Sequence, residues 1–377
     1  MKNPFHLFGL GLALFNLLFN VYIAWWAGRR LTASPWGRLG AVLGALLVSA
    51  LYPAARVLAG YGQGPFLDGL LWLAFFCFGA SFILFWSLAA CDLLLFLIGS
   101  AGLGAARSRG AAWACAALAT GLVVLAAVHG SETPRVKRIE VPVAGLPAAL
   151  DGFTIVQISD LHVGRMIKNG RIGRIAAVIA GLEPDLVVFT GDFAESREPM
   201  PAGTCEAIKG MTARYGRAAV LGNHDMFTGG QAASDFFTSC GVKMLRGEVY
   251  EPVPGLLVGG VDDLRRGDRG GAEKLAKTLD RSKPLVFLSH QPQGFDAVTA
   301  AGSGLVLAGH THNGQIFPFG PLEKRLFKYF YGLYRAGDFS VYVTSGAGSW
   351  GPPLRLFARA ELPLLTLRSV GGAEAGR

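Results

Sequence analysis

Four long apolar stretches fill the first third of this 377-residue chain and limit its fold more than any other feature. They run at about Phe5–Ala27, Leu39–Ala59, Phe66–Leu97 and Ala111–Val128. Each approaches or exceeds the roughly 20 residues that a helix needs to cross a bilayer core. Charged residues make up only 16% of the chain, against about 25% in an average soluble domain. We therefore expect residues 1–130 to form an all-α transmembrane region of about four helices.

The first apolar stretch could instead be a cleaved signal peptide, with Lys2 as a thin basic segment before it. We prefer a membrane span, because the stretch is long, no clear small-residue cleavage site precedes Arg29, and three further spans follow. Asp68 and Asp92 lie near the two ends of the third stretch. An intramembrane ion site needs a charge deep in a span, so we expect both carboxylates at membrane interfaces.

Arginines in the short connections predict the orientation in the membrane. Gly28–Arg38 holds three arginines and the third connection holds Arg107 and Arg109, whereas Gly60–Pro65 holds none. Connections rich in arginine stay on the cytoplasmic side, so both termini and the C-terminal half are expected outside the cytoplasm. Three basic residues just after the fourth stretch favour the opposite orientation: Arg135, Lys137 and Arg138.

After Gly130 strand patterns alternate with helix patterns. Ser131–Arg138 is polar and is expected to be a linker, within a predicted linker and first strand at residues 131–150. The predicted strands are Thr154–Ile158, Leu186–Phe189, Arg217–Leu221, Leu256–Val261, Leu285–Leu288, Leu305–Leu307 and Val341–Thr344. The predicted helices are Arg171–Ala180, Gln231–Cys240, Ala272–Leu279 and Gly294–Ala300. This alternation predicts an α/β domain at residues 151–368, followed by a disordered tail at 369–377.

Polar residues follow five of these predicted strands at the point where each strand ends. The five motifs are Asp160-Leu161-His162, Gly191-Asp192, Gly222-Asn223-His224-Asp225, His290 and Gly309-His310-Thr311-His312. Ligands of α/β sheets bind beyond the carboxyl ends of the strands, so five such loops can meet at one place. One histidine is usually just a hydrogen-bonded residue, but five of the seven histidines of the chain lie in these loops.

The side chains in these loops are carboxylates, imidazoles and one amide, a set that suits divalent transition metals. The candidate ligands are Asp160, His162, Asp192, Asn223, His290, His310 and His312. One tetrahedral zinc takes four ligands, so these seven suit two metals that share one bridging carboxylate. In Asp-x-His and His-x-His, two side chains of an extended segment can reach toward one centre.

The order and spacing of these motifs resemble the calcineurin-like metallophosphoesterases over roughly residues 136–368, and most of all their bacterial membrane-associated branch. The resemblance implies a four-layer α-β-β-α sandwich, with two β-sheets packed together and helices outside. It also implies two divalent metal ions, with Mn²⁺ preferred and Fe, Zn or Mg as alternatives. One metal would take Asp160, His162, Asp192 and His312, and the other Asp192, Asn223, His290 and His310, with Asp192 bridging.

His224 directly follows a candidate ligand, and we interpret it as the general acid or charge stabiliser for the leaving oxygen. An acidic partner should orient it. Many members of the family carry Asp three residues after the Gly-Asp aspartate, and Glu195 occupies that position here. Asp225 is the other candidate, with hydrogen bonding inside its loop as the alternative role.

The resemblance implies a membrane-anchored phosphodiesterase or phosphatase that uses metal-activated hydroxide. An inactive membrane receptor or scaffold is an alternative, although none of the seven ligands is missing. A lipid or cell-envelope phosphoester would suit an external site at a bacterial inner membrane. A pyrophosphatase of the UDP-2,3-diacylglucosamine type would need a cytoplasmic site. The net charge of +9 forms no dense basic stripe, which argues against nucleic acid, and nothing predicts a protein partner.

The segment Pro321–Ala336 interleaves aromatic with basic residues, a composition that suits the headgroup layer of a membrane. Our hypothesis is that it lies on the membrane and admits a lipid phosphoester to the metals, with Phe327, Lys328, Phe330 and Tyr331 in contact with lipid. The alternative is that these aromatic rings pack into the domain.

The cysteines form no CxxC pair, so the sequence does not indicate a thiolate zinc site or a redox motif. Cys77, Cys91 and Cys115 lie in apolar stretches, where cysteine acts as a small buried hydrophobe. Cys205 and Cys240 could pair in an oxidising compartment, but nothing in the sequence fixes their separation and we do not expect a bond.

Overall fold

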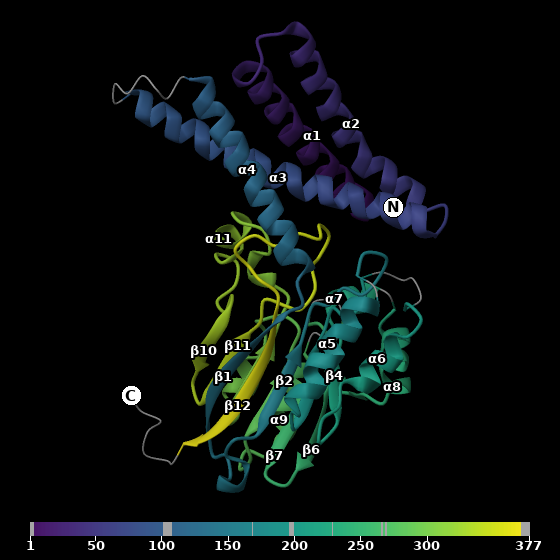
Figure 1. The fold of residues 1–377 in the computed structure, drawn as a ribbon. Helices are drawn as coiled ribbons and strands as arrows, with labels where there is room; N and C mark the ends of the chain where they lie inside the picture. Colours follow the sequence, from purple (N-terminus) through teal and green to yellow (C-terminus); the bar gives the residue numbers. More distant parts are fainter. Residues whose placement is uncertain are drawn as a thin grey trace. The chain divides into compact units, whose positions relative to one another are not determined.

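The structure, a computed structural model, describes residues 4–100, 108–167, 169–195, 200–227, 229–264, 267 and 270–370, with the backbone alone for 4–8 and 169. Lys2, Arg107 and residues 371–377, which bear on the predictions above, lie outside the described residues. The chain divides into two compact units (Figure 1). Unit 1 comprises Met1–Ser131 and Gly351–Leu356, and unit 2 comprises Glu132–Trp350 and Phe357–Arg377.

Unit 1 contains four long helices: α1 (Pro4–Arg30), α2 (Pro35–Ala59), α3 (Pro65–Ser100) and α4 (Arg109–Ser131). Each is long and apolar enough to cross a membrane. Many of their large apolar side chains are exposed, as on surfaces that face lipid. Asp92 accepts hydrogen bonds from Tyr22 Oη and Trp26 Nε1, both at 3.0 Å, and pairs with Arg30 at 2.7 Å. The hydrogen bonds and the ion pair compensate the negative charge of the Asp92 carboxylate.

A short segment far from the helices in sequence also belongs to unit 1. In Gly351–Leu356, the Arg355 backbone N–H donates to the Ala126 carbonyl of α4 at 2.9 Å, and the Arg355 side chain is fully buried. The predicted domain boundary at residue 130 assigned this segment to the α/β domain instead of to the helical unit. Its membership depends on long-range contacts that a local sequence pattern does not encode.

Unit 2 is built around two six-stranded sheets. The first has the order β1-β12-β2-β3-β4-β5, and the second has the order β10-β11-β9-β8-β7-β6. The strands of the first sheet are β1 (Arg135–Ala144), β2 (Thr154–Ile158), β3 (Leu186–Thr190), β4 (Arg217–Val220), β5 (Lys243–Met244) and β12 (Glu361–Val370). Those of the second are β6 (Glu248–Val253), β7 (Leu256–Gly260), β8 (Leu285–Leu288), β9 (Gly304–Ala308), β10 (Gly332–Ala336) and β11 (Phe339–Val343).

Helices complete unit 2. They are α5 (Asn169–Leu182), α6 (Thr204–Gly210), α7 (Asn223–Phe227), α8 (Gly230–Ser239), α9 (Gly271–Thr278), α10 (Asp296–Thr299) and α11 (Phe319–Glu323). Two short 3-10 turns lie at Ala148–Leu150 and His312–Gly314. All four helices predicted in this half of the chain are present, whereas α6, α7 and α11 were not predicted because they are only five to seven residues long.

Alternating side chains explain why the sheets form the middle of the sandwich. In β3, Leu186 and Val188 lie in the core between the sheets, and Val187 and Phe189 pack in the core that contains α5, α6 and α8. A third core joins the opposite face of the second sheet to α9 and α10. Successive residues of a strand point to opposite faces, so strands buried on both faces are continuously apolar. The predicted α-β-β-α architecture is confirmed.

Two predicted boundaries were wrong at the edge of the first sheet. Arg135–Arg138 belongs to β1 rather than to a linker, and Ser369 and Val370 belong to β12 rather than to a tail. The two strands pair in parallel along their whole length, from Arg135 with Glu361 to Ala144 with Val370. A polar edge strand can resemble a linker in sequence, because its partner lies far along the chain.

Candidate metal centre

The seven predicted ligands meet beyond the carboxyl ends of five strands. Asp160 and His162 follow β2, Asp192 follows β3, and Asn223 begins α7 after β4. His290 follows β8, and the pair His310 and His312 follows β9. Strands β2, β3 and β4 run parallel to one another, as do β7, β8 and β9, so each sheet delivers its loops to one edge.

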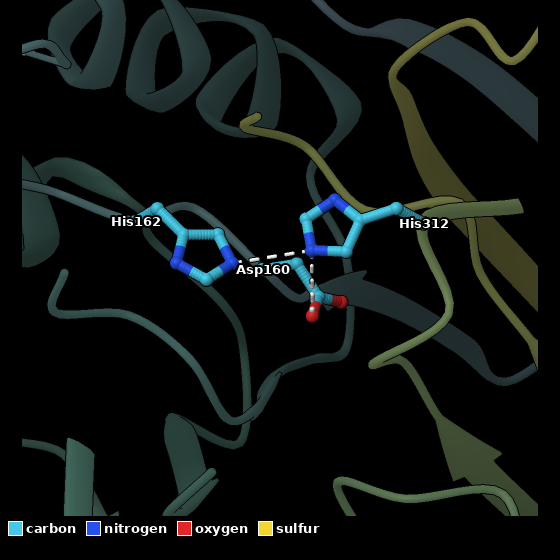
Figure 2. A group of neighbouring side chains, drawn as sticks. All are labelled: Asp160, His162 and His312. Carbon is cyan, nitrogen blue, oxygen red and sulfur yellow. Dashed lines mark hydrogen bonds and ion pairs between the residues drawn. The ribbon is translucent and has the colours of Figure 1, made fainter. Parts of the chain in front are cut away.

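Asp160, His162 and His312 form what we call the first half-site (Figure 2). His162 Nε2 lies 3.1 Å from His312 Nε2, which lies 3.4 Å from Asp160 Oδ1. All three side chains are buried. Two imidazole nitrogens and a carboxylate oxygen thus converge in a buried place, as ligands of one divalent ion do.

The second half-site consists of Asp192, Asn223, His290 and His310. His290 Nε2 lies 3.1 Å from Asn223 Oδ1, 3.1 Å from His310 Nδ1 and 3.2 Å from Asp192 Oδ2. These atoms form a second convergent set of two nitrogens and two oxygens. The structure therefore brings together all seven residues that the sequence predicted, in the two groups that the family resemblance implied.

Asp192 lies between the half-sites. Its Oδ2 atom is 3.2 Å from His290 Nε2 and 3.9 Å from His162 Nε2. Its Oδ1 atom accepts a hydrogen bond of 2.8 Å from the His224 backbone N–H. One carboxylate oxygen thus faces both half-sites, which is the arrangement expected of a bridging ligand.

The remaining ring nitrogens of His162 and His290 test whether this set fits metals. His162 Nδ1 lies 2.6 Å from Glu195 Oε2, and His290 Nδ1 lies 2.9 Å from the Thr190 carbonyl oxygen. The Thr190 carbonyl can accept the Nδ1 proton of His290, and the Glu195 carboxylate lies at ion-pair distance from His162 Nδ1, so the Nε2 atoms of both rings are the ones that face the half-sites. Metal-binding histidines are oriented in this way, so the residues fit two divalent ions.

The ligand loops adopt a backbone conformation that ordinary residues rarely take. Positive φ angles occur at Asp160 (54°), His162 (50°), Asp192 (51°), His310 (73°) and His312 (49°). Such left-handed residues carry strain, persist where the surrounding structure enforces them and cluster at functional sites. Five of the seven candidate ligands share this conformation, which turns their side chains toward the two half-sites.

Close packing against the ligands requires glycine at two positions, Gly222 and Gly309. A Cβ atom at Gly222 would overlap the Asp192 carboxylate, and one at Gly309 would overlap Ser159 Oγ and the Asp160 carboxylate. The glycines in the Gly-Asn-His and Gly-His-x-His motifs therefore serve the close approach of backbone to ligand.

Charge and burial act together on the ligands. Burial favours a raised pKa for Asp192, but His290, His224 and His162 lower it well below the usual range. Burial favours a lowered pKa for His290, but Asp192 and Asp160 raise it to about 10. The site is thus a buried set of opposite charges in which each member stabilises the charged form of another.

The two carboxylates considered for His224 have different roles. Glu195 Oε2 lies 3.8 Å from His224 Nδ1, and the Glu195 carbonyl oxygen lies 3.4 Å from the same nitrogen. Asp225 instead accepts hydrogen bonds from the backbone N–H groups of Phe193 (3.3 Å), Ala194 (2.8 Å) and Gly222 (2.9 Å). Glu195 is therefore the carboxylate beside His224, and Asp225 holds the loop that carries Asp192.

Burial shifts the titration of both groups. Burial and the neighbouring His162 lower the pKa of His224. Burial and repulsion from Asp192 raise the pKa of Asp225 to about 6.

Three residues near the site were not predicted. The His224 ring lies 5.5 Å from the Phe227 ring and 6.2 Å from the Trp350 ring, centroid to centroid. Gln315 holds Trp350 in place, since its side chain donates to the Trp350 carbonyl and accepts from the Trp350 N–H. The only local sequence signal for these residues was the glycine-rich run before Trp350. This run indicates a loop but does not predict that Trp350 lies near His224.

The predicted lipid-contacting segment is partly packed into unit 2. Phe330 is buried, and Tyr331 Oη donates to Glu361 at 2.8 Å while accepting from Lys137 Nζ at 3.0 Å. The hypothesis of lipid contact is therefore wrong for Phe330, which is buried, and stays a prediction for Tyr331, which is half-buried. Lys328 is exposed, and the Phe327 ring lies 5.7 Å from the His310 ring.

Cys205 and Cys240 form a disulfide, contrary to our expectation. Their Cα atoms are 5.2 Å apart because Cys205 lies in α6 and Cys240 directly follows α8. Both helices pack on the same core, a proximity that the spacing of 35 residues does not reveal.

The four-layer sandwich and its paired half-sites define the class as α/β proteins with a binuclear metal centre at the strand ends. The calcineurin-like phosphoesterase family model matches residues 153–314. An uncharacterized metallophosphoesterase of Aquifex aeolicus is 30% identical over 244 residues, which cover 63% of this chain and 93% of that protein. The chain belongs to the calcineurin-like metallophosphoesterase family. The family and the two half-sites together imply two divalent metal ions.

Two further relatives resemble the chain over a smaller share of their own length. A transmembrane protein with metallophosphoesterase domain from Danio rerio is 31% identical, over 66% of this chain and 60% of that protein. An uncharacterized metallophosphoesterase of Campylobacter jejuni is 32% identical, over 63% of this chain and 64% of that protein. The chain thus spans less than two thirds of these two relatives. The zebrafish relative and the four long apolar helices together indicate a membrane protein.

Proposed function

We propose that the protein is a membrane-anchored phosphoesterase with two divalent metal ions, most suitably Mn²⁺. The observation that carries this proposal is the convergence of two ligand sets on Asp192, with His224 beside them. Two such ions supply Lewis-acid activation of water and of phosphoryl oxygens. Imidazole, carboxylate and amide ligands together suit Mn²⁺, and also Fe and Zn.

The residues around the ions have separate tasks in the proposed hydrolysis. Glu195 occupies the Nδ1 side of His224, so Nε2 is the nitrogen that faces substrate and donates a proton to the leaving oxygen. Phe227 and Trp350 border the His224 ring and restrict water around the leaving group. Asp225 keeps the Asp192 loop in register with the Gly222 loop.

Hydrolysis of bis(p-nitrophenyl) phosphate by the purified full chain in detergent tests this proposal. We expect turnover with added Mn²⁺, loss of turnover with EDTA, and recovery when Mn²⁺ is restored. Asp338→Ala, at an exposed position before β11, is the control and should behave like the wild type. A protein that binds two equivalents of Mn²⁺ yet hydrolyses neither phosphomonoesters nor phosphodiesters would instead be a receptor or scaffold.

For the substrate, we propose a phosphoester attached to a lipid or another cell-envelope component. Support comes from exposed apolar side chains that follow the His310 loop in sequence, together with Phe357, whose ring centroid lies 5.9 Å from that of Phe317; we call this set the apolar rim. They are Phe317 (49% exposed), Phe319 (48%), Leu322 (56%), Leu326 (73%) and Phe357 (64%). Lys324, Arg325 and Lys328 are exposed in the same segment. Apolar side chains with neighbouring cations suit a membrane surface with anionic headgroups.

A double substitution in the apolar rim tests the substrate class. Leu322→Ser with Leu326→Ser should raise KM for a phospholipid in mixed micelles and leave bis(p-nitrophenyl) phosphate hydrolysis unchanged. Val136→Ser, on β1, is the control because Val136 is an exposed apolar residue outside the segment Pro321–Ala336. Equal loss on both substrates would mean that the leucines support the fold, and no loss on either would leave the rim without a role in lipid hydrolysis.

We propose that unit 2 lies outside the cytoplasm. Arginines at the α1–α2 connection support this orientation, and so does the Cys205–Cys240 disulfide, because such bonds persist in oxidising compartments. A nucleotide-linked lipid precursor made in the cytoplasm would not reach such a site. An alkaline phosphatase reporter fused after Arg377 should be active in cells, and a fluorescent protein that folds only in the cytoplasm should be dark at that position. The reverse result would place unit 2 in the cytoplasm.

A further inference from the structure

A groove runs along α1 and α2 in unit 1, away from the metal ligands in sequence and in chemistry. Its volume is about 650 Å³, and it is lined from Leu17 to Arg29 on α1 and from Arg38 to Leu46 on α2. Apart from the two arginines, every lining residue is apolar or glycine. The helices lie side by side along this groove (Figure 1).

Both arginines lie at the same end of the groove. Arg29 is in the last turn of α1 and Arg38 in the first turns of α2, on either side of the short α1–α2 connection. Neither has a carboxylate within 4.0 Å among the residues that the structure describes, whereas their neighbour Arg30 pairs with Asp92 at 2.7 Å. Two cations without a carboxylate partner thus lie at one end of the apolar groove, and no acidic residue lines the groove.

Both guanidinium groups are held at this end by their surroundings. Arg38 Nε donates to the Gly28 carbonyl at 3.2 Å, which uses one of the five N–H donors of the group. Arg29 lies over the Trp25 ring, 5.5 Å from its centroid. A phosphate between them would receive charge-assisted hydrogen bonds from groups that are already oriented.

The length of the groove also points to its occupant. The helical rise from Leu17 to Arg29 is about 18 Å, close to the roughly 15 Å of one leaflet of a bilayer core. We propose that the groove binds an anionic glycerophospholipid, with one acyl chain between α1 and α2 and its headgroup phosphate at Arg29 and Arg38. The groove shares no residue with the metal centre, and the proposal does not depend on the proposed phosphoesterase activity.

Native mass spectrometry of the full chain in detergent tests the site with dioleoyl phosphatidylglycerol, and with phosphatidylcholine of the same acyl chains as the zwitterionic comparison, whose choline cation compensates its phosphate. We expect phosphatidylglycerol to bind about tenfold or more tightly, since each interfacial arginine contributes about 1 kcal/mol with anionic lipid. Arg29→Gln with Arg38→Gln should remove this preference. Arg56→Gln, an exposed arginine at the other end of α2, should retain it.

A second substitution separates the chain-binding part of the site from the phosphate-binding part. Ala45→Phe places a ring in the groove and should weaken both lipids alike. If the double arginine variant fails to fold, the wild type still decides, because its preference for phosphatidylglycerol must fall with rising salt. The proposal is overturned by equal binding of the two lipids, by an unchanged preference in the double arginine variant, or by glycerol phosphate alone displacing the lipid.

Discussion

One histidine in each half-site, His290 and His162, is held by a different kind of partner. In the second half-site, the backbone carbonyl of Thr190 in β3 fixes fully buried His290. In the first, the side chain of Glu195 fixes His162 from a loop, and that side chain is 24% exposed. A backbone carbonyl at the end of a strand cannot be removed by a substitution, whereas a loop carboxylate can.

This difference predicts that substitution of one side chain can disturb the first half-site and leave the partner of His290 in place. Glu195 Oε2 also lies 3.8 Å from His224, so the group that orients a ligand of the first half-site also faces the proposed general acid. The loop after β3 therefore carries a carboxylate that faces both a ligand of the first half-site and the proposed general acid. Four substitutions test this comparison, in decreasing order of their expected effect on turnover.

Asp192→Ala should have the largest effect, because its carboxylate faces both half-sites. We expect both equivalents of Mn²⁺ to bind poorly and turnover to fall on the order of a thousandfold or more. Metal content by mass spectrometry and hydrolysis of bis(p-nitrophenyl) phosphate measure the two losses. An Asp192→Ala protein with two metals and near-normal turnover would show that the half-sites do not share a ligand.

His224→Ala should leave both half-sites occupied and still lower turnover. We expect a loss of roughly a hundredfold with an alkyl phosphodiester and less with a p-nitrophenyl ester, whose leaving group needs little protonation. Metal content measured on the same preparation serves as the control. Equal losses for the two leaving groups would argue for charge stabilisation rather than proton donation.

Glu195→Gln should distinguish the half-sites from each other. The affinity of one metal should fall about 10–100-fold while the other stays bound, because only His162 loses its carboxylate partner. Titration with Mn²⁺ should then show one tight and one weakened equivalent instead of two tight ones. Parallel weakening of both metals would mean that the two half-sites do not differ in the way described.

Asp225→Asn should change turnover least among the four and stability most clearly. The amide group introduced by this substitution would face backbone donors that the carboxylate now satisfies, which costs about 1–3 kcal/mol in the free energy of unfolding. Thermal unfolding of the metal-loaded protein measures this loss, and turnover of the folded fraction should stay within a few-fold of wild type. A loss of turnover as large as that of His224→Ala would assign Asp225 to the catalytic dyad instead.

Local sequence determined the main features of both units. Four apolar stretches of membrane-spanning length became α1 to α4, because a chain in lipid must satisfy its own backbone hydrogen bonds. Short apolar runs became buried strands, and the polar residues that end them became the ligand loops. These features depend on neighbours in sequence, such as Asp160 with His162 or His310 with His312, and parallel strands bring the loops to one edge.

Tertiary structure alone decided which distant groups became partners. It assigned Glu195 to His162 and His224, left Asp225 to three backbone amides, and joined Cys205 to Cys240. It also buried Phe330 and placed Gly351–Leu356 in unit 1. Each of these outcomes depends on which surfaces meet when the chain is packed. The sequence around these residues does not predict such a contact. A carboxylate, a thiol or an aromatic ring has the same neighbours in sequence whether or not a distant partner packs against it.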